Sequence, residues 1–152
     1  MTVVKSHRFP VAVHRHETGL VRANVPGKVE LSVAVPPELR GRHEGIWSPE
    51  ELLAAAVASC FAVTLEVVAE HMGVPLHDVD VRGTTNVERT DGRYRITHVE
   101  LAVTIETDPG FVERARDAAQ RTERLCLVSA ALDCGVTARI DVGAAPRPTV
   151  AV

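Results

Sequence analysis

The spacing of apolar and polar residues changes from a period of two to a helical pattern near residue 48. Before that point, apolar residues at alternate positions predict three strands, over residues 3–16, 20–24 and 29–35. Turn signals separate these strands at Glu17-Thr18-Gly19 and at Val25-Pro26-Gly27-Lys28. Three short strands joined by tight turns predict an antiparallel meander, followed by a loop over residues 36–46.

The next segment predicts a long apolar helix. Ser48 is a good N-cap, Pro49 suits the first helical position, and Glu51 completes a capping box. We expect the helix to end near His71 or Met72, because Gly73 can terminate it. Residues 52–65 form the longest uncharged stretch of the chain, so this part of the helix should be buried on all sides.

The second half of the chain predicts two more strands, a charged helix and a last strand. The strands cover residues 77–87 and 94–107 around a hairpin turn at 90–93, the helix starts near residue 108, and the last strand covers 136–142. Residues 125–132 predict a short further helix or a bent continuation. The order βββ-α-ββ-α-β indicates an α+β fold with helices on antiparallel sheet. We expect one domain over residues 1–143 and a flexible tail over 144–152.

Composition narrows the classes of partner. The net charge of −3 and the aromatic content of 3% argue against a nucleic-acid partner. No uninterrupted apolar run reaches the ~18 residues of a membrane span, so we expect no membrane partner. The first residues lack the apolar region of a secretion signal, and three irregularly spaced cysteines make no disulfide framework. These features predict a cytoplasmic protein with reduced thiols.

Two cysteines lie in apolar surroundings, Cys60 in the long helix and Cys126 sixty-six residues later. A buried free cysteine is most often a small core residue. The alternative is a pair in which one thiol reacts and the other resolves. That chemistry needs a thiolate, a cation such as arginine to stabilise it, and a second thiol to condense with the sulfenic acid. Cys134, at the start of the last strand, is interpreted as structural.

Two motifs resemble the OsmC/Ohr family of osmotically inducible and organic hydroperoxide resistance proteins. The first runs from Trp47-Ser48-Pro49-Glu50-Glu51 through the alanines to Ala58-Ser59-Cys60-Phe61, and the second is Cys126-Leu127-Val128-Ser129-Ala130. The resemblance extends from the opening strands to about Val142. It implies the OsmC-like fold, an intertwined homodimer, and a thiol-dependent peroxidase that reduces organic hydroperoxides to alcohols without a bound cofactor. A dithiol of the lipoyl type would be the reductant.

The same resemblance assigns roles to individual residues. Cys60 would be the peroxidatic cysteine and Cys126 the resolving cysteine. Glu50 would be the carboxylate that orients an activating arginine, for which Arg15 is the first match and Arg22 the second. The chain departs from the family where Leu127 replaces the usual proline after the second cysteine. Candidates for the lining of a peroxide pocket are the aromatic residues Phe9, Trp47, Phe61, Tyr94 and Phe111.

Helix geometry constrains the position of Glu50. Ten residues separate Glu50 from Cys60, which is about 15 Å along one straight helix. Either the Glu50 end leaves the helix, or the carboxylate near each Cys60 comes from a second subunit. Small residues along this helix, at Ala54, Ala55, Ala58 and Ala62, favour the second option and a homodimer with composite sites.

Two other functions compete with the peroxidase. His14 and His16 share one face of a strand and His43 lies in the following loop, but a metal site is disfavoured because no Cys-x-x-Cys pair accompanies them. The other alternative is a dimeric redox-sensing or small-molecule-binding protein that keeps the fold without turnover.

Overall fold

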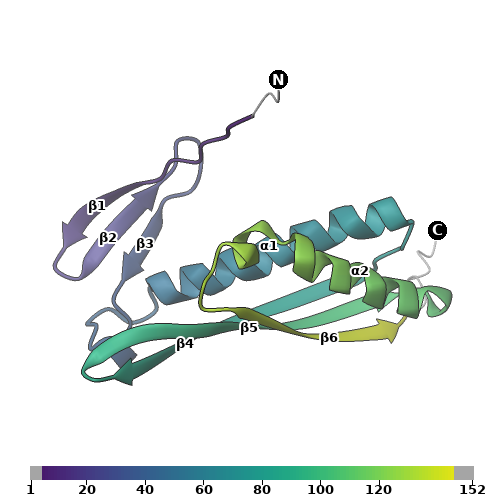
Figure 1. Ribbon diagram of the computed structural model, residues 1–152. Coiled ribbons are helices and arrows are strands. Elements are labelled where there is room, and N and C mark those ends of the chain that lie inside the picture. Colours follow the sequence, from purple (N-terminus) through teal and green to yellow (C-terminus); the bar gives the residue numbers. More distant parts are fainter. Residues whose placement is uncertain (1–4, 146–152) are drawn as a thin grey trace. The chain divides into compact units, whose positions relative to one another are not determined.

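The computed structural model describes residues 5–145, and its backbone divides into two units between Leu52 and Leu53. The N-terminal unit contains β1 (Ala12–Glu17), β2 (Leu20–Asn24), β3 (Leu31–Ala34) and a 3-10 turn, η1 (Pro37–Leu39). The strands pair antiparallel in the order β1-β2-β3 (Figure 1), which confirms the predicted meander. β1 begins at Ala12, and residues 5–11 of the predicted first strand are irregular; Pro10 among them has no N–H to donate to a sheet. Residues 3 and 4 of that prediction lie outside the described part.

The long helix α1 (Pro49–Met72) has the predicted ends. The Ser48 N–H donates to Glu51 Oε2 at 2.7 Å, and the Glu51 N–H donates to Ser48 Oγ at 3.1 Å. This reciprocal capping box satisfies two donors that a helix N-terminus would otherwise leave free. At the other end the chain turns at Gly73, which has φ 62°, a value that glycine tolerates without strain.

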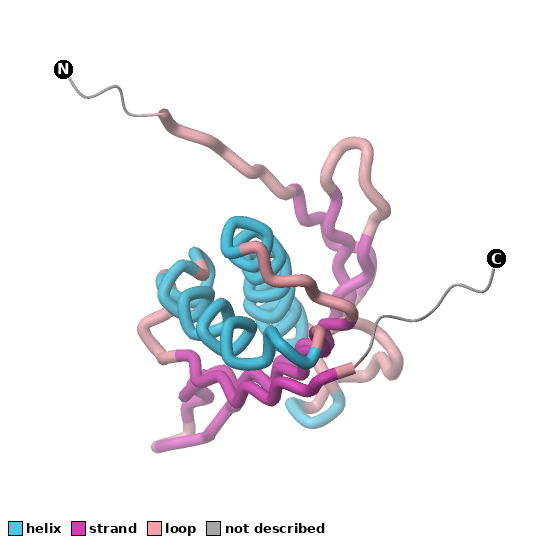
Figure 2. The backbone as a smooth tube through the Cα atoms, turned by 90° about the vertical axis from the view of Figure 1, so that its right-hand side faces the viewer, coloured by secondary structure: helices cyan, strands magenta, loops and turns pink. Residues whose placement is uncertain are grey.

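The C-terminal unit places two helices on one face of a three-stranded sheet (Figures 1 and 2). After the main part of α1 come β4 (Asp78–Thr90), β5 (Arg93–Thr107), the 3-10 turn η2 (Pro109–Phe111), α2 (Val112–Leu125), α3 (Leu127–Ala130) and β6 (Val136–Ala144). The predicted element order βββ-α-ββ-α-β is confirmed, with the 3-10 turns η1 and η2 added. Asp91 and Gly92, both with positive φ, form the predicted hairpin turn between β4 and β5.

The expectation of purely antiparallel sheets is wrong for β6. The sheet order is β4-β5-β6; β4 and β5 pair antiparallel, whereas β6 pairs parallel with β5 over Val136–Ala144. The reason is the crossover connection: the chain leaves β5 at Thr107, passes through α2 and α3, and enters β6 beside Val99, near the end of the sheet where β5 begins. A helical crossover of this kind joins parallel strands. The C-terminal sheet is therefore mixed.

The core of this unit lies between the sheet and the two helices. Alternate apolar side chains of β5 face the helices, and apolar side chains of α1 and alanines of α2 pack against them. Among the most buried core residues are Val57, Phe61, Leu65, Val99, Val103, Ile105, Ala115, Ala118 and Ala119. Gly83 in β4 lets the strand approach α1 closely. A Cβ there would lie 2.7 Å from the carbonyl oxygen of Ala54.

The prediction that residues 52–65 of α1 are buried on all sides is wrong. Val63 and Val67 are 59% and 53% exposed, and Ala56 and Ser59 on the same side of the helix are exposed as well. The sheet and α2 cover other sides of α1, but within the C-terminal unit they leave this side exposed to solvent. A solvent-exposed apolar strip on a helix is unusual in a stable monomer.

Length and composition alone would let α1 cross a membrane. The core helix of a globular protein has the same features, and here Val57, Phe61 and Leu65 of α1 are buried in the core. Ala144, which was expected in the C-terminal tail, is the last residue of β6, and residues 146–152 of that tail lie outside the described part. The expectation of a single domain over residues 1–143 stays a prediction.

Candidate thiol site

Two elements of the C-terminal unit bring Cys60 and Cys126 together. Cys60 lies in the middle of α1 and is half-buried, whereas Cys126 is fully buried. Cys126 does not lie within a helix. It forms the bend between α2 and α3 with φ −64° and ψ 108°, and its backbone bonds to both sides, from its N–H to Thr122 O and from the Ala130 N–H to its own carbonyl. The short further helix expected in this region is present as α3.

The surroundings of Cys60 favour its thiolate. Burial by itself raises the pKa of Cys60, but hydrogen bonds from the Val128 N–H, the Cys126 thiol, the Thr64 hydroxyl and the Leu127 N–H outweigh it. The pKa of Cys60 therefore lies below the ordinary value of a thiol. A thiolate is the nucleophilic form of cysteine, so this environment activates Cys60 at lower pH than a free cysteine.

The second sulfur has a donor of its own. Ser129 Oγ donates to Cys126 Sγ at 3.1 Å, and Ser129 is half-buried one turn after Cys126. All three cysteines are free thiols in this structure. Cys134 is half-buried, and it packs against the core where the chain approaches β6.

Glu50 lies in the first turn of α1 and is half-buried. Since Glu50 and Cys60 belong to one continuous helix, their separation is about 15 Å along its axis. Of the two options for Glu50, departure from the helix is therefore excluded. The carboxylate cannot contact the Cys60 of its own helix.

The two candidate arginines belong to the N-terminal unit. Arg15 on β1 is exposed and donates to Thr18 Oγ1 at 3.4 Å. Arg22 on β2 is half-buried, forms an ion pair with Glu30 at 2.7 Å, and donates to His16 Nε2 at 3.4 Å. The role of either arginine stays a prediction.

Sequence reasoning missed four groups that contact the sulfurs, one of them the N–H of Val128. Thr64 lies one helical turn after Cys60, and this i, i+4 spacing is visible in the sequence. The N–H of Leu127 could have been inferred from the replacement of proline, which has no N–H. Ser129 follows Cys126 by three residues, but only the bend at Cys126 turns its hydroxyl toward the sulfur.

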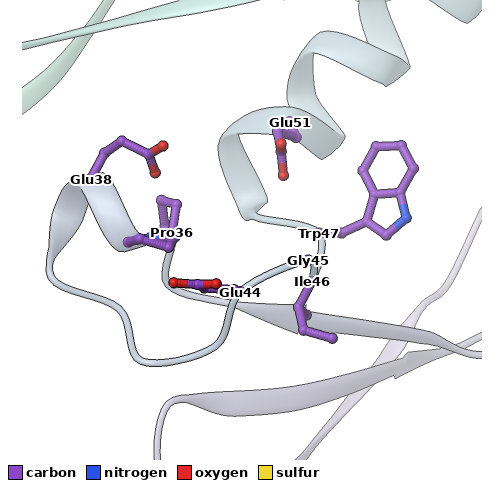
Figure 3. Close-up of a pocket in the computed structure, with 8 residues that line it drawn as sticks. Pro36, Glu38, Glu44, Gly45, Ile46, Trp47 and Glu51 are labelled. Carbon is purple, nitrogen blue, oxygen red and sulfur yellow. The ribbon is translucent and has the colours of Figure 1, made fainter.

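The aromatic residues do not form one lining. Within the C-terminal unit, Phe61 is buried in the core, Tyr94 is exposed under the guanidinium of Arg89, and Phe111 lies under that of Arg114. In the N-terminal unit, Phe9 is 90% exposed and Trp47 borders a separate open hollow of about 440 Å³ (Figure 3). Glutamates, prolines, Gly45 and Ile46 form the rest of that hollow, and no cysteine is among its lining residues.

The histidines proposed as metal ligands do not form a cluster. Within residues 5–145, no group of three or more His, Cys, Asp or Glu side chains could hold a metal ion. His16 accepts from Arg22, and His43 Nε2 donates to the carbonyl of Thr18 at 3.2 Å. In the described part of the chain, His16 and His43 take part in polar contacts of the N-terminal unit.

Comparison with known proteins agrees with this architecture. A family model described as OsmC-like protein matches residues 42–141, more than half of the chain. The uncharacterized protein YmaD of Bacillus subtilis is 25% identical over 132 residues, covering 84% of this chain and 85% of YmaD. This relative shares the sequence pattern but carries no stated activity.

Three solved structures share the fold. An OsmC-like protein of unknown function from Vibrio cholerae superimposes with a TM-score of 0.76 at 14% identity, covering 90% of this chain and all of that one. An organic hydroperoxide resistance protein from Elizabethkingia anophelis gives 0.73 at 20% identity, with 93% and 100% covered. The organic hydroperoxide resistance protein OsmC of Legionella pneumophila gives 0.72 at 25% identity, with 92% and 99% covered. The chain belongs to the family of OsmC-like proteins.

Proposed function

We propose that this protein is a cysteine-based peroxidase that reduces organic hydroperoxides to alcohols. The observation that carries the proposal is the pairing of Cys60 with Cys126, in which donors from α1, α3 and Cys126 lower the pKa of Cys60. Similarity to two proteins described as organic hydroperoxide resistance proteins supports the same chemistry. We place this activity in the cytoplasm, where thiols stay reduced.

The reaction divides into an oxidative and a reductive half. The Cys60 thiolate attacks the terminal oxygen of the hydroperoxide, the O–O bond breaks, and the alkoxide takes up a proton to leave as the alcohol. Cys60 becomes a sulfenic acid. Cys126 then attacks the Cys60 sulfur, hydroxide leaves with the Cys126 proton as water, and a disulfide forms. A dithiol, which we propose to be of the lipoyl type, reduces this disulfide and is itself oxidised.

An arginine would stabilise both the thiolate and the negative charge on the leaving oxygen. Arg15 is our first candidate, Arg22 the second, and Glu50 the carboxylate that holds the arginine. Because Glu50 lies about 15 Å along α1 from the Cys60 of its own chain, it would serve the Cys60 of a second copy. We therefore propose a homodimer with two composite sites.

Steady-state turnover tests the proposal. The purified protein should reduce cumene hydroperoxide faster than hydrogen peroxide with dihydrolipoamide as donor. Cys60→Ser should abolish turnover, and Cys126→Ser should allow Cys60 to be oxidised without disulfide formation. Cys134→Ser is the matched control, because Cys134 is not among the groups that shift the pKa of Cys60, and it should keep full activity.

Two outcomes would contradict this assignment. Turnover that persists in Cys60→Ser would remove the cysteine mechanism. A wild-type Cys60 that reacts once with the hydroperoxide, and that no dithiol recycles, would favour the non-turnover redox sensor or binding protein of the same fold. Comparison of Arg15→Ala with Arg22→Ala then identifies the activating arginine, as the variant with the larger loss in kcat/KM.

A further inference from the structure

Ser129 connects to the reacting sulfur through the buried one. Its hydroxyl donates to Cys126 Sγ at 3.1 Å, and the Cys126 thiol in turn donates to Cys60. The three groups form a directed chain of hydrogen bonds, from Ser129 to Cys126 to Cys60. Successive hydrogen bonds in a low-dielectric interior polarise one another, so the first bond strengthens the second.

Burial gives the two sulfurs different roles in reduction. Cys126 is fully buried, whereas Cys60 is only half-buried. The sulfur that an incoming thiolate can reach is the one that it attacks, and the other sulfur leaves. In a Cys60–Cys126 disulfide, the reductant therefore attacks Cys60, and Cys126 is the leaving group.

We propose that Ser129 is a positioning residue for the resolving cysteine, which orients the Cys126 thiol toward Cys60 and stabilises the Cys126 thiolate whenever it forms. This inference rests on the proposed peroxidase function and adds a residue to it. The hydroxyl of Ser129 bonds to Cys126, and Ser129 is not among the groups that bond to Cys60, so it acts through Cys126.

The hydroxyl would act in two steps of the cycle. When Cys126 attacks the Cys60 sulfenic acid, the S–S bond forms, the S–O bond breaks, and the Cys126 proton leaves with the hydroxide as water. When a dithiol thiolate later attacks Cys60, a mixed disulfide forms and the electron pair of the S–S bond goes to Cys126. Cys126 is a thiolate before it attacks in the first step and becomes one as it leaves in the second, and a hydrogen bond to a charged acceptor is stronger than one to a neutral acceptor.

The test separates these steps from the attack on peroxide. Protein with Cys134→Ser is oxidised with one equivalent of cumene hydroperoxide, and mass spectrometry follows the Cys60–Cys126 disulfide and the dimedone-trapped sulfenic acid. Ser129→Ala should form the disulfide about tenfold more slowly, as expected from the loss of a hydrogen bond to a charged group, and should accumulate more trapped sulfenic acid. Hydroperoxide consumption in the first turnover should change little.

Two further variants distinguish positioning from packing. Ser129→Thr keeps a hydroxyl and should restore the rate. Ser59→Ala removes a serine beside Cys60 whose hydroxyl donates to Ala56 O of its own helix, and it should match the wild type. A failure of Ser129→Thr to restore the rate, with both variants folded by circular dichroism, would assign Ser129 a packing role and overturn the inference.

A second readout does not depend on peroxidase activity. The disulfide is formed with diamide and its reduction by dithiothreitol is timed; Ser129→Ala should be reduced about tenfold more slowly, because the leaving thiolate loses its donor. Unchanged rates of both formation and reduction in Ser129→Ala would overturn the inference. Wild-type protein that fails to consume the hydroperoxide, but shows the Ser129 effect in the reduction assay, would contradict the proposed function alone.

Discussion

At the scale of the residue, the reactivity of Cys60 depends on three donors from outside its own helix and one from within it. Thr64 lies on α1, but Leu127, Val128 and Cys126 come from the bend between α2 and α3. A cysteine in the middle of an apolar helix would otherwise have a raised pKa and little thiolate at neutral pH. The bend at Cys126 therefore turns a packed core cysteine into a candidate nucleophile.

The replacement of the family's proline by Leu127 gives Cys60 one additional donor, and Leu127→Pro should remove it. Proline suits the first position of α3, and Cys126 before it already has the extended conformation that a following proline requires. Loss of this N–H should raise the pKa of Cys60, so that the thiolate forms only at higher pH. The measurement is the rate of iodoacetamide alkylation of Cys60 against pH.

Leu127→Ala is the control, because it removes the exposed side chain and keeps the N–H. Its alkylation midpoint should equal that of the wild type and lie below the midpoint of Leu127→Pro. Equal midpoints for the proline and alanine variants would show that this N–H contributes nothing to the thiolate.

At the scale of the element, local sequence signals predicted most of the fold. The capping box of Ser48 and Glu51, the glycine stop of α1 and the hairpin turn at Asp91-Gly92 are each decided by a few neighbouring residues. The parallel pairing of β6 depends on how a distant crossover returns to β5, and no local pattern encodes it. The same limit applies to the candidate site: both cysteines stand out in the sequence, whereas the donors from Val128 and Ser129 required the path of the backbone.

The close approach of β4 to α1 leads to a prediction about stability. Gly83→Ala would place a Cβ 2.7 Å from the Ala54 carbonyl oxygen and 3.4 Å from the Ala54 Cβ, and neither neighbour is a flexible side-chain end. The helix and strand must separate slightly, so the free energy of unfolding should fall by about 1–3 kcal/mol. Urea denaturation followed by circular dichroism measures this change.

Gly110→Ala is the matched glycine control. A Cβ at Gly110 meets no atom within 4 Å, so the free energy of unfolding of this variant should stay close to that of the wild type. If Gly83→Ala is as stable as Gly110→Ala, the sheet and α1 have room that their backbone positions do not indicate.

At the scale of the whole molecule, the exposed strip of α1 connects the fold to the proposed function. The strip consists of Ala56, Ser59, Val63 and Val67, and Cys60 lies beside it. The same helix carries Glu50 too far from its own Cys60 to act on it. A second copy that covers the strip would bury apolar surface and could also deliver the missing carboxylate and arginine.

Val63→Glu tests this combination, because a charge in the strip should prevent a second copy from packing there. Sedimentation velocity should show a dimer for the wild type and a monomer for the variant. Peroxide turnover in the monomer should fall by about 100-fold or more, the usual effect of losing a charge-stabilising group. The pH midpoint of Cys60 alkylation should shift much less, since Thr64, Cys126, Leu127 and Val128 belong to the same chain as Cys60.

Gln120→Glu is the control: it adds the same charge to the exposed polar side of α2 and should leave both the dimer and turnover intact. A clean monomer with full peroxidase activity would show that each chain assembles its site alone, and the activating arginine would then have to reach the Cys60 of its own chain.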